Sequence, residues 1–165
     1  MNKNPTKYYS SIQEKRIASY LGWKVVSGSG SRNCRPGDVV STRWLGECKT
    51  HTSSGKKIYF GKDIWIKISA EASSQFKSPC LFSDDGSQDT SRTWVMIPSA
   101  CVSYQDINRV SFECENKNSF SFKHEAAECL ETQFNDKPVV LFPCGVSNIC
   151  ILRLSTFNSM FGELK

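Results

Sequence analysis

The segment GDVVSTRWLGECKT (residues 37–50) predicts two consecutive β-strands and with them the centre of the fold. Residues 38–42 and 44–50 are rich in β-branched, aromatic and apolar side chains, which is typical of strands, and their proximity indicates a hairpin. Side chains alternate between the two faces of a strand, so Glu47 and Lys49 project from one face and Cys48 from the other. The hairpin brings the carboxylate of Asp38 beside that of Glu47.

The segments on either side of this hairpin predict an α/β fold with a central mixed sheet. Tyr8–Leu21 lacks Gly and Pro, carries apolar residues at helical spacing and is followed by Gly22, a typical helix end. Lys62–Lys77 also predicts a helix, closed by Pro79, because apolar residues recur at intervals of four. Further strands are expected at 23–27, 80–83 and 93–97, the last two separated by an acidic turn at 84–86.

Beyond Ser99 the pattern is less regular. We expect a hairpin of residues 110–114 and 119–122, a short helix at 125–134, and strands at 139–142 and 149–154. No linker divides the chain, so residues 1–165 are expected to form one domain. In that domain, residues 1–98 are the core and 99–165 are extra C-terminal strands that serve dimerisation or target recognition. The apolar residues of 149–154 and 157–161 are candidates for a dimer interface.

The charge distribution favours a polyanionic partner. The chain has a formal net charge of +5, but residues 1–67 hold 13 basic and 4 acidic side chains, whereas residues 68–165 hold 8 and 12. The alternative is a solvated basic face without a partner.

The eight cysteines are interpreted as reduced thiols that pack in the core. No pair has C-x-x-C spacing, and the two histidines lie far apart in the sequence, so a structural zinc site is not expected. Residues 1–9 lack the apolar region of an export signal, and no apolar run is long enough to cross a bilayer. We therefore expect a cytoplasmic protein without a membrane partner, encoded by a cell or by a virus that acts in its host.

The carboxylates of Asp38 and Glu47 predict a site for a hard divalent cation. Two adjacent carboxylates repel each other unless a cation lies between them, and Mg²⁺ commonly binds one or two carboxylates together with water and substrate phosphate. Such an ion polarises a phosphodiester and lowers the pKa of its bound water. Lys49 would orient or deprotonate that water, or stabilise the charge that develops on the phosphate.

This pattern resembles the PD-(D/E)-x-K nuclease superfamily. Pro36-Gly37-Asp38 followed by Glu47-Cys48-Lys49 resembles the signature itself. The order of a helical Glu14, a Gly-Ser loop (residues 28–31), the aspartate and then Glu-x-Lys is similar to archaeal-type Holliday junction resolvases. The resemblance covers residues 7–97, and residues 99–165 have no counterpart in it.

The resemblance implies a restriction-endonuclease-like core and a crossover junction endodeoxyribonuclease. The metal ligands would be Asp38, Glu47 and Glu14, with Mg²⁺ as cofactor and Mn²⁺ as a substitute. Lys49 completes the catalytic set. The product would be a nicked strand with a 5′-phosphate and a 3′-hydroxyl. A four-way DNA junction needs two symmetric cuts, so the enzyme would be a homodimer with two-fold symmetry.

The expected DNA contacts are basic or small polar residues near this site, because arginine binds phosphate in a bidentate manner and glycine lets a backbone approach it. They are Arg32, Arg35, Lys62, Ser29, Ser31, Lys15 and Arg16. Two other functions remain open from the sequence. One is a restriction-type or nicking endonuclease on the same fold, and the other is a DNA-binding module without turnover.

Overall fold

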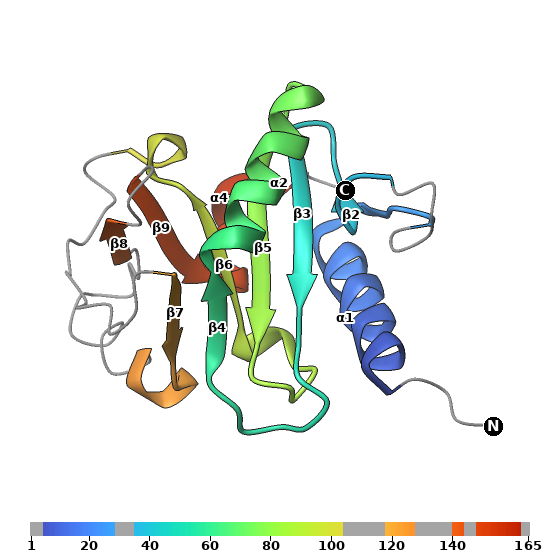
Figure 1. Cartoon of the computed structure of the whole chain (residues 1–165), viewed down its shortest axis with the longest axis vertical. Helices are drawn as coiled ribbons and strands as arrows, with labels where there is room; N and C mark the ends of the chain where they lie inside the picture. The colour runs from blue at the N-terminus through green and yellow to red at the C-terminus, as the bar shows by residue number, and fades with distance from the viewer. Residues whose placement is uncertain (1–4, 29–34, 104–117, 128–139, 144–147, 163–165) are drawn as a thin grey trace.

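A seven-stranded mixed β-sheet forms the centre of the protein in the computed structural model, which describes residues 5–28, 35–103, 118–127, 140–143 and 148–162 (Figure 1). The strand order is β1-β2-β3-β5-β6-β9-β8. Strands β3 and β5 are parallel, and the other neighbours are antiparallel. The strands are β1 (Lys24–Val25), β2 (Val39–Val40), β3 (Trp44–Lys49), β5 (Ser78–Asp84), β6 (Thr93–Pro98), β8 (Val140–Pro143) and β9 (Asn148–Arg153).

Helices cover both faces of this sheet (Figure 1). Helix α2 (Lys62–Ser74) packs on one face through Trp65, Ile68 and Ala72. Helices α1 (Pro5–Leu21) and α4 (Leu154–Phe161) pack on the other face. Short 3₁₀ turns precede and follow β6 as η1 (Thr90–Arg92) and η2 (Ser99–Cys101). The expected α/β class with a central mixed sheet flanked by helices is confirmed.

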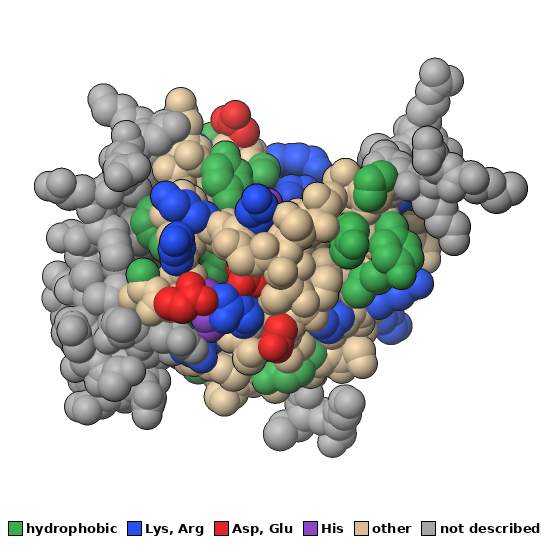
Figure 2. Space-filling view, turned by 90° about the horizontal axis from the view of Figure 1, so that it is seen from below, with side chains coloured by type: hydrophobic (Ala, Val, Ile, Leu, Met, Phe, Trp, Pro, Cys, Tyr) green, Lys and Arg blue, Asp and Glu red, His purple; other side chains and the backbone are tan. Residues whose placement is uncertain are grey.

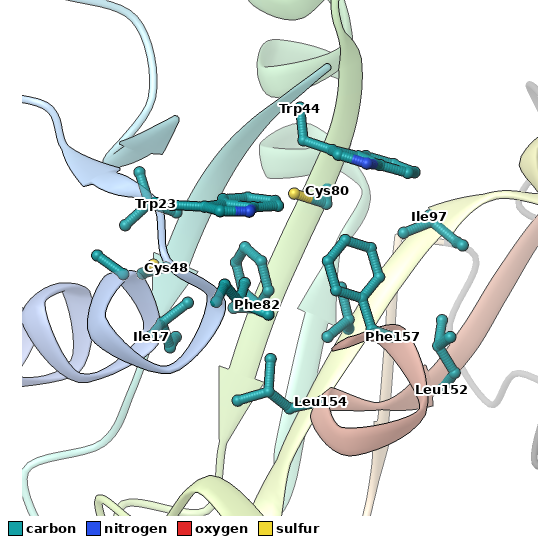
Figure 3. Close-up of a cluster of buried hydrophobic side chains, with 14 of the residues drawn as sticks. Ile17, Trp23, Trp44, Cys48, Cys80, Phe82, Ile97, Leu152, Leu154 and Phe157 are labelled. Carbon is teal, nitrogen blue, oxygen red and sulfur yellow. The ribbon is translucent and has the colours of Figure 1, made fainter. Parts of the chain in front are cut away.

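The core beneath α1 and α4 is aromatic (Figure 3). The ring of Phe157 lies 5.1 Å from that of Trp44 and 5.8 Å from that of Trp23, both edge to face. Phe82 reaches the same ring from β5 at 5.9 Å. Edge-to-face pairs of buried aromatic rings stabilise a core beyond the area they bury, so α4 is joined firmly to the strands next to α1.

A second, two-stranded sheet extends the α2 side of the molecule. It pairs β4 (Ile58–Gly61) with β7 (Ser119–Phe122) in antiparallel register. We expected no strand at 58–61. The expected strand at 119–122 is present, but its described partner is β4, and its expected partner at 110–114 lies outside the described residues. The stacked rings of Phe60 and Phe122, 6.4 Å apart, explain why these two strands associate.

The predicted hairpin is confirmed, since β2 pairs antiparallel with β3 and Val39 lies opposite Gly46. The element ends differ more. Helix α1 begins at Pro5, earlier than expected, and α2 ends at Ser74 rather than at residue 77. Pro79 does not end that helix but lies inside β5.

The C-terminal residues are integrated into the main sheet. Strand β9 lies between β6 and β8, and Ile149–Leu152, Leu154 and Phe157 are almost fully buried. The proposed dimer interface at 149–154 and 157–161 is therefore wrong for these side chains, because they fill the core of the chain itself. Residues 124–127 are helical as expected, and the rest of the predicted 125–134 helix lies outside the described residues.

The described cysteines, at positions 48, 80, 101 and 150, are all free thiols, as expected, while the other four lie outside the described residues. Among the helices that the structure describes, none combines the length and apolar character that a bilayer crossing requires.

Candidate functional site

A cavity of about 690 Å³ brings together the four predicted catalytic residues. Glu14 reaches it from α1, Asp38 from the residue before β2, and Glu47 and Lys49 from β3. These residues lie up to 35 positions apart in the sequence, and the fold gathers them at the edge of the sheet between α1 and α2.

The hairpin geometry fixes the two strand carboxylates. The backbone amide of Cys48 donates a hydrogen bond of 2.9 Å to Asp38 Oδ2, and the amide of Asp38 donates one of 2.8 Å to the carbonyl oxygen of Gly46. A side chain at Gly46 would lie 2.6 Å from Phe82, so only glycine fits there. Cys48 packs into the core on the opposite face, as strand alternation predicts.

Burial and mutual repulsion raise the pKa values of the carboxyl groups in the cavity. Burial is the largest cause at Glu14, and the nearby charges of Asp38 and Glu47 add to it, bringing the pKa of Glu14 to about 7. The pKa of Asp38 is also raised, first by burial and then by Glu47, against the opposing hydrogen bond from Cys48. The protein therefore concentrates negative charge that is not fully neutralised, which is what a cation-binding site requires.

Lys49 is held as an ammonium ion. Its Nζ atom lies 2.6 Å from Glu47 Oε1. Burial alone would lower the pKa of Lys49, but the hydrogen bond and the charge of Glu47, followed by Asp38, outweigh it and raise the pKa. In this arrangement Lys49 donates hydrogen bonds and stabilises negative charge, and it becomes a proton acceptor only if Glu47 turns to another cation.

The donor set fits Mg²⁺ in its usual protein mode. The described residues contain no cluster of three or more His, Cys, Asp or Glu side chains that encloses a metal position. Mg²⁺ seldom uses such all-protein cages and instead binds through one or two carboxylates, with water and substrate phosphate completing its shell. Asp38 and Glu47 supply those carboxylates, and Glu14 offers a third at the same cavity.

Helix α2 contributes two residues that the sequence analysis missed. Lys67 Nζ lies 3.7 Å from Glu47 Oε2 and 3.7 Å from Glu71 Oε1, and Glu71 Oε2 accepts a hydrogen bond of 3.2 Å from the amide of Gly37. Gly37 has a φ of +71° and leads directly into Asp38. The i,i+4 spacing of Lys67 and Glu71 was the available signal, since it places both on one flank of a helix that follows the Glu-x-Lys strand.

A fully buried carboxylate, Asp84, lies outside the lining of the cavity. Asp84, at the end of β5, accepts hydrogen bonds from Arg16 (2.7 Å), Gln13 (3.2 Å), Thr50 (2.5 Å) and the amide of Gly86 (2.8 Å). The acidic turn expected at 84–86 begins one residue later, since Asp84 is the last residue of β5, and both Asp84 and Asp85 are at most 1% exposed.

Gln13 connects this network to the cavity. Its amide nitrogen also donates a bond of 2.7 Å to the carbonyl oxygen of Lys49. This bond joins α1, which carries Glu14, to the end of β3, which carries Lys49. The network therefore helps to fix the distance between Glu14 and Lys49.

The predicted DNA contacts fall into four groups. Arg35 lines the cavity and is exposed, whereas Lys15 and Lys62 lie outside its lining. The side chain of Arg16 is only 16% exposed and pairs with Asp84, which gives it a structural role in place of the expected phosphate contact. Ser29, Ser31 and Arg32 lie outside the described residues. Lys7, which we had not selected, joins Arg35 and Lys67 at the cavity.

The charge of the surface is not uniform. The face seen in Figure 2 carries Lys and Arg side chains beside Asp and Glu side chains, so it offers no continuous basic surface. The basic residues at the cavity are therefore a more specific feature than the basic excess of residues 1–67.

Comparisons with family models, with characterised proteins and with solved structures find no match for this chain.

Proposed function

We propose that this protein is a Mg²⁺-dependent DNA endonuclease with a restriction-endonuclease-like core. The observation that carries the proposal is the convergence of Glu14, Asp38, Glu47 and Lys49 on one cavity. Mixed α/β sheets hold many unrelated activities, so the fold by itself would not support this function. The site does, because it combines oxygen ligands, a lysine beside them and basic residues at the same opening.

In this proposal each residue has a chemical role. Asp38 and Glu47, with Glu14, would hold the cation, whose chemistry when bound would be to polarise the scissile phosphate and to lower the pKa of a bound water. The ammonium group of Lys49 stabilises charge on the phosphate and orients the water. Lys7, Arg35 and Lys67 neutralise the adjacent phosphates of the strand.

The proposed substrate is a four-way DNA junction, and the proposed active form is a homodimer. A junction is resolved by two symmetric cuts, which a two-fold dimer delivers. The buried C-terminal core leaves the dimer interface unassigned among the described residues. A restriction-type or nicking endonuclease would use the same cavity, and the substrate test below separates these activities.

One observation favours the second candidate, a DNA-binding module without turnover. Both oxygens of Glu47 already face lysines, with Lys49 at 2.6 Å and Lys67 at 3.7 Å. If the protein is a nuclease, the binding of Mg²⁺ and phosphate would replace the contacts of Glu47 with the two lysines. In a binding module these contacts would persist, and Lys67 would remain at Glu47 instead of contacting DNA.

The deciding experiment is a cleavage assay on a four-way junction with Mg²⁺, beside the matched linear duplex, a single strand and an EDTA control. The proposal expects paired nicks in the junction, dependent on Mg²⁺. Equal cutting of duplex and junction would support the restriction-type or nicking activity. Binding without cleavage of any substrate would overturn the nuclease in favour of the binding module.

A further inference from the structure

Phe76, just after α2, combines two unfavourable features that no contact among the described residues compensates. Its phenyl ring is 99% exposed, and its backbone has a φ of +56°, in the left-handed region that favours glycine. Both features cost free energy, and neither is required by packing. Such an outlier on an ordered helix end indicates a role outside the folded chain.

The helix end explains why a glycine would be expected here. The amide of Lys77 donates to the carbonyl oxygen of Ala72 (2.9 Å), and the amide of Phe76 donates to that of Ser73 (3.1 Å). This pair of bonds defines a Schellman motif, in which the residue at the position of Phe76 is usually glycine. Among the described residues, the most exposed aromatic ring therefore stands at a position whose backbone favours glycine.

The surroundings of Phe76 are basic. Lys77 follows it, and the Lys77 Nζ atom donates to the carbonyl oxygens of Ser41 (2.6 Å) and Thr42 (2.8 Å), which leave its charge unneutralised. The backbone of Arg43 adjoins the same place, since the amide of Ser78 donates to its carbonyl oxygen, while its guanidinium group lies over the rings of Trp44 and Phe161. Neither residues 41–43 nor 73–78 include an acidic residue.

A second cavity, of about 390 Å³, opens beside this group and is lined in part by Lys24 and Lys77. An exposed aromatic ring among positive charges matches a nucleic acid, which offers flat base faces and a phosphate backbone together. An acidic protein surface would also be attracted to this basic rim, but it does not offer a regular series of flat ring faces for Phe76, so the combination of ring and charge favours a nucleic acid.

The position of Phe76 connects it to the proposed active site. Helix α2 carries Lys67 and Glu71 at the first cavity, and its C-terminal end protrudes beyond the sheet (Figure 1). Phe76 follows Glu71 by five residues, a rise of about 8 Å along a helix. A strand with its phosphate in the first cavity would reach Phe76 within about three nucleotides, at a rise of about 3.4 Å each.

We infer that Phe76 is a stacking platform for a nucleobase face that the DNA substrate leaves uncovered, with Lys77 and Lys24 holding the adjoining phosphates. This inference rests on the proposed function for its substrate class. A base pair inside a duplex has both faces covered, whereas a single strand and the base pairs at the centre of an open four-way junction leave faces free, so the platform selects branched or single-stranded DNA over closed duplex.

The test is the binding of a four-way junction, a single strand and the matched duplex in EDTA, where cleavage is absent. Stacking of one base supports roughly a tenfold change in affinity. Phe76→Gly should therefore weaken junction and single-strand binding about tenfold and change duplex binding little. The same variant should raise the thermal unfolding midpoint by about 2 °C, because glycine relieves the left-handed backbone.

Two controls sharpen the result. Phe76→Trp keeps an aromatic face and should retain wild-type affinity, and Tyr59→Ala removes another exposed ring, on β4, and should have no effect. The inference is overturned if Phe76→Gly binds the junction as tightly as the wild type does. It is also overturned if the substitution changes only the self-association of the protein and not its DNA affinity.

Failure of the two proposals gives different results. A wild-type protein that binds the junction through Phe76 but never cuts it retains this inference and loses the nuclease. A protein that cuts the junction with Phe76→Gly unaffected loses only this inference. A protein that binds no DNA overturns both.

Discussion

The carboxylate of Asp84 and the three carboxylates of the cavity differ in how far hydrogen bonds and ion pairs satisfy them. Asp84 is fully buried and accepts four hydrogen bonds, including one from Arg16. Glu14, Asp38 and Glu47 face a cavity, and burial and mutual repulsion raise the pKa values of Glu14 and Asp38. Asp84 therefore stabilises the fold, whereas the cavity carboxylates repel one another, and a bound cation would relieve that repulsion.

The largest expected effect is on catalysis at the cavity. Asp38→Asn or Glu47→Gln should lower the rate of Mg²⁺-dependent DNA cleavage by about a thousandfold, because each removes a ligand of the cation that stabilises the transition state. DNA binding in EDTA should hold or tighten, since a negative charge near phosphate is lost. Single-turnover kinetics and binding titrations measure the two quantities.

The matched control is Asp63→Asn, which changes an exposed carboxylate in the first turn of α2 and should leave the rate unchanged. Wild-type cleavage by either cavity variant would show that these carboxylates are not the catalytic site.

The next effect is on stability at Asp84. Asp84→Asn should lower the free energy of unfolding by about 3 kcal/mol, because it leaves the guanidinium of Arg16 buried without its anion. Chemical denaturation followed by Trp fluorescence measures this. Asp89→Asn, at an exposed 3₁₀ N-cap, should cost about 1 kcal/mol or less. Equal losses in the two variants would contradict the distinction between a satisfied network and an ordinary cap.

A smaller effect on stability is expected at Glu14, where replacing the carboxylate stabilises the protein at high pH instead of destabilising it. Its pKa is raised to about 7 in the folded protein, so between its ordinary pKa of 4.5 and pH 7 the folded state binds more protons than the unfolded state. The metal-free protein therefore loses stability as pH rises through this window, and the loss is complete above it. Because the group is only partly buried, we expect about 1–2 kcal/mol after allowance for solvent screening.

Glu14→Gln should remove this pH dependence and make the metal-free protein more stable than wild type at pH 8 but not at pH 4. Thermal unfolding in EDTA across this range measures it, with Asp63→Asn, which changes an exposed carboxylate of α2, as the control. The repulsion assigned to Glu14 would be contradicted if the unfolding midpoint of the wild type rose between pH 5 and 7 while that of Glu14→Gln stayed constant.

The two regions also differ in how far the sequence predicts them. The cavity carboxylates on β2 and β3 are predictable, because strand alternation and a short hairpin are local rules that place Asp38 and Glu47 side by side. The Asp84 network is not, because its donors come from α1, from the end of β3 and from the turn after β5. Only the packed fold reveals that an acidic pair before a glycine is buried rather than exposed.

Similar limits apply to the other differences. Lys67 and Glu71 face the cavity only because α2 packs across β3. The spacing of apolar residues within 62–77 predicts a helix but not the strand on which it packs. Strand β4 depends on pairing with β7, some 60 residues later. The apolar residues of β9 are equally suited to an interface and to a core, and the pairing with β6 decides between them.

The most direct test of the central claim is a Mg²⁺ titration of the free protein at pH 8, followed by thermal unfolding. A ligand that binds only the folded state raises the unfolding midpoint. The account predicts that Mg²⁺ raises the midpoint of the wild type and leaves that of Asp38→Asn unchanged. A wild-type midpoint that does not respond to Mg²⁺ or Mn²⁺, or an equal rise in both proteins, would contradict a cation site formed by Glu14, Asp38 and Glu47.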